Sequence, residues 1–201
     1  MEPFKTNWTE EEYLSGTGLD PEIRYEYVRG RVYAMATPSA THAEISSNLF
    51  VPLHTLLKGK PCRAYMGNMA LRINFLGKPA FYIPDVMVAC DENPRSTNFR
   101  GEPLVLVEVM SPATAGNDLR EKLLAYTAIP TLRHYLIVNQ SMVEVFHYQR
   151  NPLSATGWSD ATLSAPSDLI QLPELGFSLT VEELYTESGL EAGAVVQDSV
   201  I

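Results

Sequence analysis

The chain has 201 residues, of which 45% are hydrophobic and 19% are charged. This length and composition fit one folded domain that buries roughly 70% of the surface its unfolded chain exposes, and they exclude a disordered or fibrous protein. The formal net charge of −9 comes mostly from residues 151–201, which contain eight acidic residues and no lysine or arginine. Residues 1–150 are close to neutral, so the sequence permits a local basic groove but predicts no strong general affinity for nucleic acid.

The sequence contains no sign of a membrane or export segment. No apolar run approaches the roughly 18 residues of a membrane span, and the acidic start MEPFKTNWTEEEYL lacks the basic and apolar regions of a signal peptide. The two cysteines, Cys62 and Cys90, do not indicate a disulfide framework and form no CxxC metal motif. We therefore expect a cytoplasmic protein without membrane contact.

The N-terminal part predicts a helix, a hairpin and a second helix. Thr9 and Glu12 have the spacing of a capping box for a short first helix. YEYVRGRVYAMA predicts two strands around a turn at Arg29–Gly30. In THAEISSNLFVPLHTLL, a helix is expected to begin with a capping box at Thr41 and to kink or break at Pro52.

The remaining segments predict a mixed α/β (α+β) order. Strands are expected in RAYMG, MALRINF and YIPDVMVAC, with LGKPA as the turn between the last two, and after a polar loop in LVLVEVM. NDLREKLLAYTA predicts an amphipathic helix with a capping box at Asp118. RHYLIVN and MVEVFHY predict two more strands, followed by short β pieces and a helix capped by Thr180. We expect one domain over 1–187 and a disordered acidic tail over 188–201.

Glu108 lies in the middle of the apolar strand LVLVEVM. A buried, ionised carboxylate without a partner costs several kcal/mol, so Glu108 requires a cation, a metal or hydrogen-bond donors. Asp85 begins another strand, directly after Pro84. If the two strands are neighbours, carboxylates 4 Å apart repel by about 4 kcal/mol at an effective dielectric near 20. A divalent cation removes this repulsion, and hard oxygen ligands favour Mg²⁺ or Mn²⁺.

Lys122 follows in the next predicted helix. The buried stripe of that helix is set by Leu119, Leu123 and Tyr126, and Lys122 falls at the edge of this stripe. Its ammonium group is therefore expected to point toward the sheet. Beside a metal-bound phosphate, a lysine can orient the nucleophile and offset developing negative charge.

The ordered motifs PDVMVA, LVLVEVMSPAT and NDLREKLLAY resemble those of the Uma-two family of endonucleases, a branch of the PD-(D/E)xK restriction-endonuclease-like superfamily. The resemblance covers residues 8–185. It implies a restriction-endonuclease-like mixed β-sheet flanked by helices, and a Mg²⁺-dependent (or Mn²⁺-dependent) endonuclease that acts on DNA. It also implies that Asp85 and Glu108 are metal ligands and, with Lys122, catalytic residues. Glu26 and His42 fall where the family usually has an acid and a histidine, and are the lesser catalytic candidates.

The sequence departs from the superfamily pattern at two positions. Met110 stands where the superfamily has a lysine, and Lys122 from the helix resembles its replacement. Arg31 stands where the family more often has an acid. Because cutting both strands of a duplex takes two active sites, and two-fold dimers are the commonest oligomers, we expect a homodimer.

Each candidate residue also has a structural interpretation. Asp85 could cap backbone amides, and Glu108 could be an edge-strand carboxylate or a structural partner of Lys122. Lys122 could extend from the helix edge into solvent, Glu26 could be a solvated hairpin residue, and His42 a surface histidine. The alternative function is a catalytically inactive nuclease-fold binding domain, which the acidic balance of the chain favours.

Overall fold

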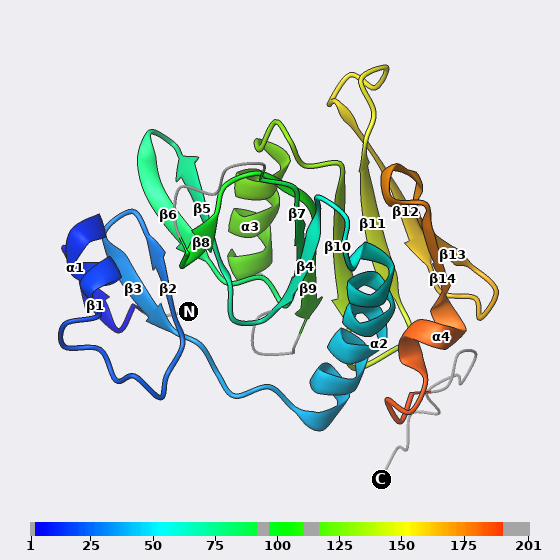
Figure 1. Ribbon diagram of the computed structural model, residues 1–201, viewed down its shortest axis with the longest axis horizontal. Coiled ribbons are helices and arrows are strands. Elements are labelled where there is room, and N and C mark those ends of the chain that lie inside the picture. The colour runs from blue at the N-terminus through cyan, green and yellow to red at the C-terminus, as the bar shows by residue number, and fades with distance from the viewer. Residues whose placement is uncertain (1–2, 92–96, 111–116, 191–201) are drawn as a thin grey trace, which may run out of the picture.

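The computed structural model describes residues 3–91, 97–110 and 117–190, and most of its strands belong to two six-stranded sheets (Figure 1). Sheet A has the strand order β1-β3-β2-β6-β5-β8, and sheet B has the order β12-β11-β10-β9-β7-β4. Strands β13 (Leu169–Leu172) and β14 (Phe177–Thr180) form a separate hairpin. The mixed α+β class expected from the sequence is confirmed, with the strands divided between two large sheets.

Sheet A is built from the N-terminal half of the chain. Its hairpin of β2 and β3 turns at Arg29 and Gly30, whose φ angles of 53° and 89° are both positive, as a two-residue turn of this kind requires. This part of the prediction is confirmed. The strands of sheet A are β1 (Lys5–Thr6), β2 (Tyr25–Val28), β3 (Arg31–Ala34), β5 (Ala70–Phe75), β6 (Lys78–Tyr82) and β8 (Phe99–Arg100).

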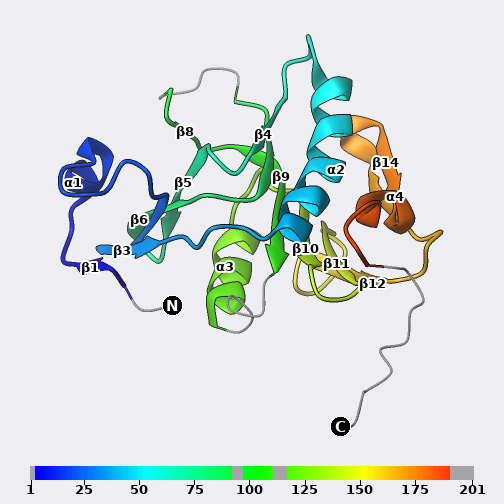
Figure 2. The same cartoon turned by 90° about the horizontal axis from the view of Figure 1, so that it is seen from below.

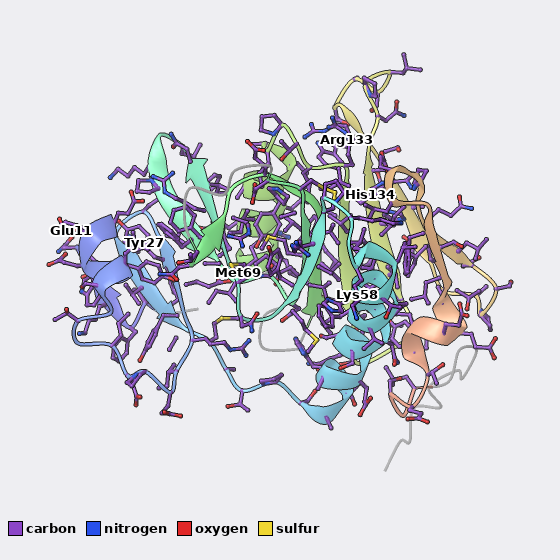
Figure 3. The ribbon with its side chains drawn as sticks, in the orientation of Figure 1. Glu11, Tyr27, Lys58, Met69, Arg133 and His134 are labelled. Atoms are coloured by element: carbon purple, nitrogen blue, oxygen red, sulfur yellow. A yellow bond between two sulfur atoms is a disulfide. The ribbon has the colours of Figure 1, made fainter. Side chains whose placement is uncertain are left out.

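Helix α1 (Glu10–Ser15) packs on one face of sheet A. The capping box predicted for Thr9 and Glu12 is present, so the start of this helix is fixed by its own side chains. The rings of Tyr13 and Tyr27 stack with centroids 5.3 Å apart, and Tyr27 lies beside α1 in Figure 3. The aromatic residues of β2 thus point to the α1 side. Glu26 lies between them in the strand, so its side chain points to the opposite face.

Sheet B forms the centre of the fold. Its strand β9 pairs in parallel with β10 and antiparallel with β7. The sheet consists of β4 (Arg63–Met66), β7 (Val86–Ala89), β9 (Pro103–Met110), β10 (His134–Asn139), β11 (Val145–Arg150) and β12 (Trp158–Leu163). Along β9, Val105, Val107 and Val109 join one hydrophobic cluster, whereas Leu106 joins the other. Glu108 therefore shares the face of Leu106.

Helices cover both faces of sheet B. Figure 2 shows β9 between α3 (Asn117–Thr127) and α2 (Ala40–Leu57), with α4 (Val181–Tyr185) beside α2. The valines of β9 share a cluster with α2, α4 and the β13–β14 hairpin. The opposite face packs against Ala125 and Tyr126 of α3 and also against sheet A. Glu108 consequently lies in the layer between the two sheets.

The segment YIPDVMVAC, which was predicted as one strand, contributes to two strands in different sheets. Its first residue, Tyr82, ends β6 in sheet A, and Val86–Ala89 form β7 in sheet B. Pro84 separates the two strands, because proline has no N–H to donate to a strand ladder. LGKPA is likewise shorter as a turn than expected, since Lys78 already belongs to β6. The chain crosses between the sheets at residues 83–85, and Asp85 stands at the end of this crossing.

Helix α2 also differs from its prediction at two points. Its N-cap is Ser39, whose side chain accepts a hydrogen bond from the backbone N–H of His42, so the capping box expected at Thr41 is wrong. The helix continues through Pro52 without a break. The loss of one backbone hydrogen bond is outweighed there by a continuous apolar stripe, which consists of the buried residues Ile45, Leu49, Leu53 and Leu57.

The C-terminal elements close the α2 side of sheet B. Thr180 caps α4 in a capping box with Glu183, as predicted. The 3-10 helix η1 (Pro173–Leu175) connects the two strands of the hairpin. Ser188 is buried, and its carbonyl accepts a hydrogen bond from Thr41, so the described fold continues past the expected boundary at 187. The predicted tail from 191 onward and the side chain of Asp118 lie outside the described residues.

The two cysteines form one disulfide, Cys62–Cys90, which the sequence did not indicate. The register of β4 and β7 explains it: Arg63 pairs with Ala89, so the residues just outside the two strands stand opposite each other. Within the described residues, no helix is long and apolar enough to cross a membrane.

Two histidines of sheet B, His134 in β10 and His147 in β11, are buried next to η1. His134 Nε2 lies 2.7 Å from Glu174 Oε2, and His134 Nδ1 lies 3.0 Å from His147 Nε2. Figure 3 shows His134 near the start of β10, next to Arg133. Burial, and secondarily the neighbouring His134, lower the pKa of His147 to about 4.

This histidine predicts a specific loss of stability in acid. Since the pKa of His147 is lower in the folded chain than the roughly 6.5 of an unfolded chain, the unfolded state binds its proton first as the pH falls. Between about pH 6.5 and 4, His147 should therefore reduce the free energy of unfolding by up to about 1.4 kcal/mol per pH unit. His147→Gln should lose less stability than the parental chain between pH 7 and pH 5 in urea titrations. Parallel losses in the two proteins would contradict this.

Candidate functional site

Five side chains predicted from the sequence meet between the two sheets. Glu26 comes from β2, His42 from the first turn of α2, Asp85 from the crossing segment, Glu108 from β9 and Lys122 from α3. Lys122 Nζ lies 3.0 Å from Glu26 Oε1 and 3.1 Å from Glu108 Oε2. His42 Nε2 lies 3.1 Å from Asp85 Oδ2. The structure thus gathers all five candidates, which are up to 96 positions apart in the sequence.

Strand register places the two predicted metal ligands side by side. Val86 pairs with Val107 in the antiparallel ladder of β7 and β9, so the next pair outward is Asp85 and Glu108. The Asp85 carboxylate is also fixed to β9 directly, because Val109 N–H donates to Asp85 Oδ2 at 2.7 Å. The neighbouring-strand arrangement that the sequence argument assumed is therefore present.

Helix α3 brings its lysine to this pair of carboxylates. Lys122 and Tyr126 are four residues apart and so share one helix face. Tyr126 Oη donates to Glu108 Oε1 at 2.8 Å, while Lys122 contacts Glu108 Oε2. Both Glu108 oxygens are thus bound from the same face of α3. Lys122 Nζ also lies 5.9 Å from the ring centroid of Tyr82, which contributes to enclosing the ammonium group.

Glu26 joins the site from the other sheet. Its neighbours Tyr25 and Tyr27 point to the α1 face of sheet A, so the alternation of β2 directs Glu26 inward. Glu26 Oε1 accepts a hydrogen bond of 3.0 Å from the backbone N–H of Ile83, two residues before Asp85. The same carboxylate therefore holds the crossing segment and contacts Lys122.

Burial decides between several interpretations of these residues. Only 5% of the Lys122 side chain and 8% of the Glu26 side chain are exposed, so neither is a solvated surface residue. The His42 side chain is 16% exposed and faces Asp85, which excludes a free surface histidine. Two structural interpretations do describe real contacts, since Asp85 accepts a backbone N–H and Glu108 pairs with Lys122. The catalytic and metal-binding roles stay predictions.

Burial also perturbs the titration of Glu108. Desolvation raises the pKa of this carboxyl group well above its ordinary value; Lys122 and Tyr126 lower it, and Asp85 and Glu26 raise it further. Three carboxylates share this region with one lysine and one histidine. The site therefore has an excess of potential negative charge, which an additional cation would offset.

The donor set fits a cation that takes few protein ligands. Asp85 Oδ2 is engaged by Val109 and His42, whereas Oδ1 has no hydrogen-bond partner among the described residues. Within the part of the chain that the structure describes, no group of three or more His, Cys, Asp or Glu residues could hold a metal. Mg²⁺ typically uses one or two carboxylates and completes its octahedron with water and substrate phosphate. Asp85 and Glu108 supply two carboxylates on neighbouring strands, and their role as metal ligands stays a prediction.

Sequence reasoning missed the polar role of Tyr126, which it placed only in the apolar stripe. The available signal was its spacing: a tyrosine four residues after a buried lysine reaches the same partner. A buried tyrosine hydroxyl also requires a hydrogen-bond partner, and the predicted buried carboxylate of Glu108 required a hydrogen-bond donor.

Comparison with known proteins identifies the family. The family described as "Uma2: Putative restriction endonuclease" matches residues 10–182, a range that includes all five site residues. The chain belongs to the Uma2 family. The expected resemblance is therefore confirmed, and a nuclease-like function is supported at the level of the family.

The chain is also similar to two relatives and to one solved structure. The uncharacterized protein slr1290 of Synechocystis sp. is 35% identical over 176 residues, which cover 87% of this chain and 90% of the relative. A second Synechocystis protein, sll1609, is 30% identical over 71% of this chain and 80% of its own. The crystal structure of a "putative nuclease belonging to DUF820" from Anabaena variabilis has a TM-score of 0.69. At 18% identity over 89% of this chain and 97% of that one, it shows a shared fold.

The buried ion pairs of this Uma2 site predict strong energetic coupling. Lys122→Met keeps the approximate volume but leaves Glu26 and Glu108 without their cation, so we expect a loss of about 3–5 kcal/mol in the free energy of unfolding. Lys122→Met combined with Glu108→Gln should reduce the free energy of unfolding by less than the sum of the two single changes. The reason is that the double variant leaves only one carboxylate, Glu26, without its cation. Guanidinium titrations of the four proteins measure this coupling.

Arg120→Met provides the matched control, because Arg120 is an exposed residue of the same helix. Its cost should stay within about 0.5 kcal/mol. Additive losses for Lys122 and Glu108 would show that the two side chains are not coupled.

Proposed function

We propose that this protein is a Mg²⁺- or Mn²⁺-dependent endonuclease that hydrolyses phosphodiester bonds in DNA. The observation that carries this proposal is the buried Lys122 ammonium, held between Glu26 and Glu108 with the Asp85 carboxylate beside them. Membership of the Uma2 family supports the nuclease class. The metal requirement, the DNA substrate and the residue roles are parts of the proposal.

Each side chain has a role that its contacts suggest. Asp85 and Glu108 would hold the divalent cation, which when bound polarises the phosphate and acidifies a water molecule. Tyr126 positions the Glu108 carboxylate, and the Val109 N–H positions that of Asp85. Lys122 supplies positive charge that orients the attacking water and offsets charge on the phosphoryl oxygens.

The proposed reaction balances without a redox partner. The water oxygen bonds to phosphorus as the bond from phosphorus to the leaving oxygen breaks. The water loses one proton, and the leaving oxygen gains one. His42 is placed next to Asp85, where its ring can hold the carboxylate in position; Glu26 holds Lys122 from the opposite side.

The same proposal includes DNA as the partner, a homodimer and a cytoplasmic location. A homodimer would supply two active sites for the two strands of a duplex. The alternative is a binding domain without catalytic activity. Binding of DNA by the parental protein without cleavage in either metal would favour that alternative.

Metal binding can be tested by its linkage to stability. A cation that binds only the folded state should stabilise the parental protein by about 2.7 kcal/mol at one hundred times its dissociation constant. Without metal, Asp85→Asn should be neutral or stabilising, because it relieves repulsion with Glu108 and Asn can still accept from Val109 N–H. With Mn²⁺, the parental protein should become the more stable of the two in melting scans.

If Asp85→Asn destabilises the chain equally with and without Mn²⁺, Asp85 has a structural role and the metal site fails. Mn²⁺ is the only ligand added in this test, so the result does not depend on knowing the DNA target.

Cleavage assays should separate the lysine from the metal ligands. Lys122→Met should retain the Mn²⁺-induced melting shift but cleave DNA about 10²–10³ times more slowly, since one lost transition-state charge contact has that effect. Glu108→Gln should lose both the shift and the cleavage. The assay uses linear duplex, single-stranded and branched DNA with Mg²⁺ and with Mn²⁺. Cleavage at the parental rate by folded Lys122→Met would refute the role of the lysine.

A further inference from the structure

Arg24 is a basic residue beside the site that sequence reasoning did not select. It directly precedes β2 and lies two positions before Glu26, so the strand alternation places both side chains on the same face. Two residues of strand span roughly 7 Å. The Arg24 side chain is partly buried, and it therefore stands at the solvent end of the face that carries Glu26.

Two hydrogen bonds through Gly67 fix Arg24 relative to Asp85. Arg24 Nη1 donates to the carbonyl oxygen of Gly67 at 2.6 Å, and Gly67 N–H donates to the backbone carbonyl of Asp85 at 2.9 Å. Gly67 has a φ of 57°, and a Cβ at this position would lie 3.0 Å from Arg24 Nη1. The glycine thus permits both the turn and the close approach of the guanidinium group.

The charge of Arg24 is not neutralised within the described residues. Among the described residues, its side chain donates one hydrogen bond, to the backbone carbonyl of Gly67, and no described carboxylate pairs with it. A guanidinium group has five N–H donors in a planar fork that matches two phosphate oxygens. A single carbonyl bond leaves most of this fork available while holding the group in place.

We propose that Arg24 binds a phosphate group of the DNA strand next to the proposed metal site. This inference rests on the proposed function and extends that function by naming a substrate-binding residue. The carbonyl of Gly67 orients the guanidinium fork, and the fork fixes the strand backbone relative to Asp85. Because a phosphate contact carries no base information, Arg24 supports binding without sequence preference.

The test compares Arg24→Gln with the parental protein and with Lys58→Gln. Lys58 is an exposed residue at the C-terminal cap of α2, roughly 24 Å of helix away from His42, and its change removes the same charge. Binding of a fluorescent 20-base-pair duplex is measured by anisotropy at several KCl concentrations without divalent cation. Melting scans with Mn²⁺ alone report the metal site in each protein.

Arg24→Gln should weaken duplex binding about tenfold or more and reduce the salt slope of log K by about one, because one phosphate contact is lost. The Mn²⁺-induced melting shift should stay at the parental value. Arg24→Lys keeps the charge but not the planar fork, so its affinity for the duplex should lie between those of Arg24→Gln and the parental protein. Lys58→Gln should bind like the parental protein.

The outcomes separate this inference from the proposed function. An unchanged salt slope in Arg24→Gln, with DNA still cleaved by the parental protein, overturns the role of Arg24 alone. A lost Mn²⁺ shift in Arg24→Gln shows that the residue only supports the Gly67 turn, and also overturns it. A parental protein that binds DNA with the expected Arg24 dependence but never cleaves it upholds the phosphate contact and refutes the nuclease. Absence of duplex binding by the parental protein refutes the phosphate contact of Arg24, whereas absence of cleavage of every DNA substrate with Mg²⁺ and with Mn²⁺ refutes the nuclease.

Discussion

The contact between Lys122 and its two carboxylates connects the main parts of the fold. Glu26 belongs to sheet A, Glu108 belongs to sheet B, and the lysine reaches both from α3. Desolvating three ionisable groups costs several kcal/mol for each ion, so the arrangement is tolerable only because each group is paired and hydrogen-bonded. The geometry of one buried ammonium group thus requires that the two sheets and α3 keep fixed positions. A site that depends on this contact is accordingly built on strands and a helix.

The crossing segment before β7 makes this joint arrangement possible. Pro84 ends the pairing of one sheet, and the following residues begin the next, so Asp85 is placed where the sheets meet. Its backbone bonds toward β4, and its side chain bonds toward β9. Glu26 holds the same segment through the N–H of Ile83. A proline–aspartate pair therefore has a topological function here in addition to any chemical one: it terminates one ladder and presents a carboxylate to the neighbouring strand.

Local signals predicted the elements well where side chains within one element decide the outcome. The capping boxes of Thr9 and Thr180 and the Arg29–Gly30 turn are examples, since each is satisfied by residues a few positions away. Prediction failed where distant packing decides, as at Pro52, where an apolar stripe keeps the helix continuous, and in YIPDVMVAC, which two sheets divide. The site residues were predictable because a carboxylate in an apolar strand and a lysine on a buried helix face each require a partner. The hydroxyl of Tyr126 was missed because an aromatic residue already fits an apolar stripe without any polar contact.

The distribution of charge bears on how an acidic chain can bind a polyanion. All 15 lysines and arginines precede residue 151, and the acidic C-terminal part contributes β13, β14 and α4. These elements pack with α2 against the valine face of β9 (Figure 2). Strand alternation directs Glu108 to the opposite face, which also carries Leu106. Two layers packed on a sheet are about 10 Å apart, which is close to the Debye length at physiological ionic strength. Glu182 and Glu183 of α4 are therefore largely screened from the proposed site, and the charge that DNA would meet there is set by local groups, which include the cations Arg24 and Lys122. The net charge of −9 consequently limits nonspecific affinity more than it limits binding at this one face.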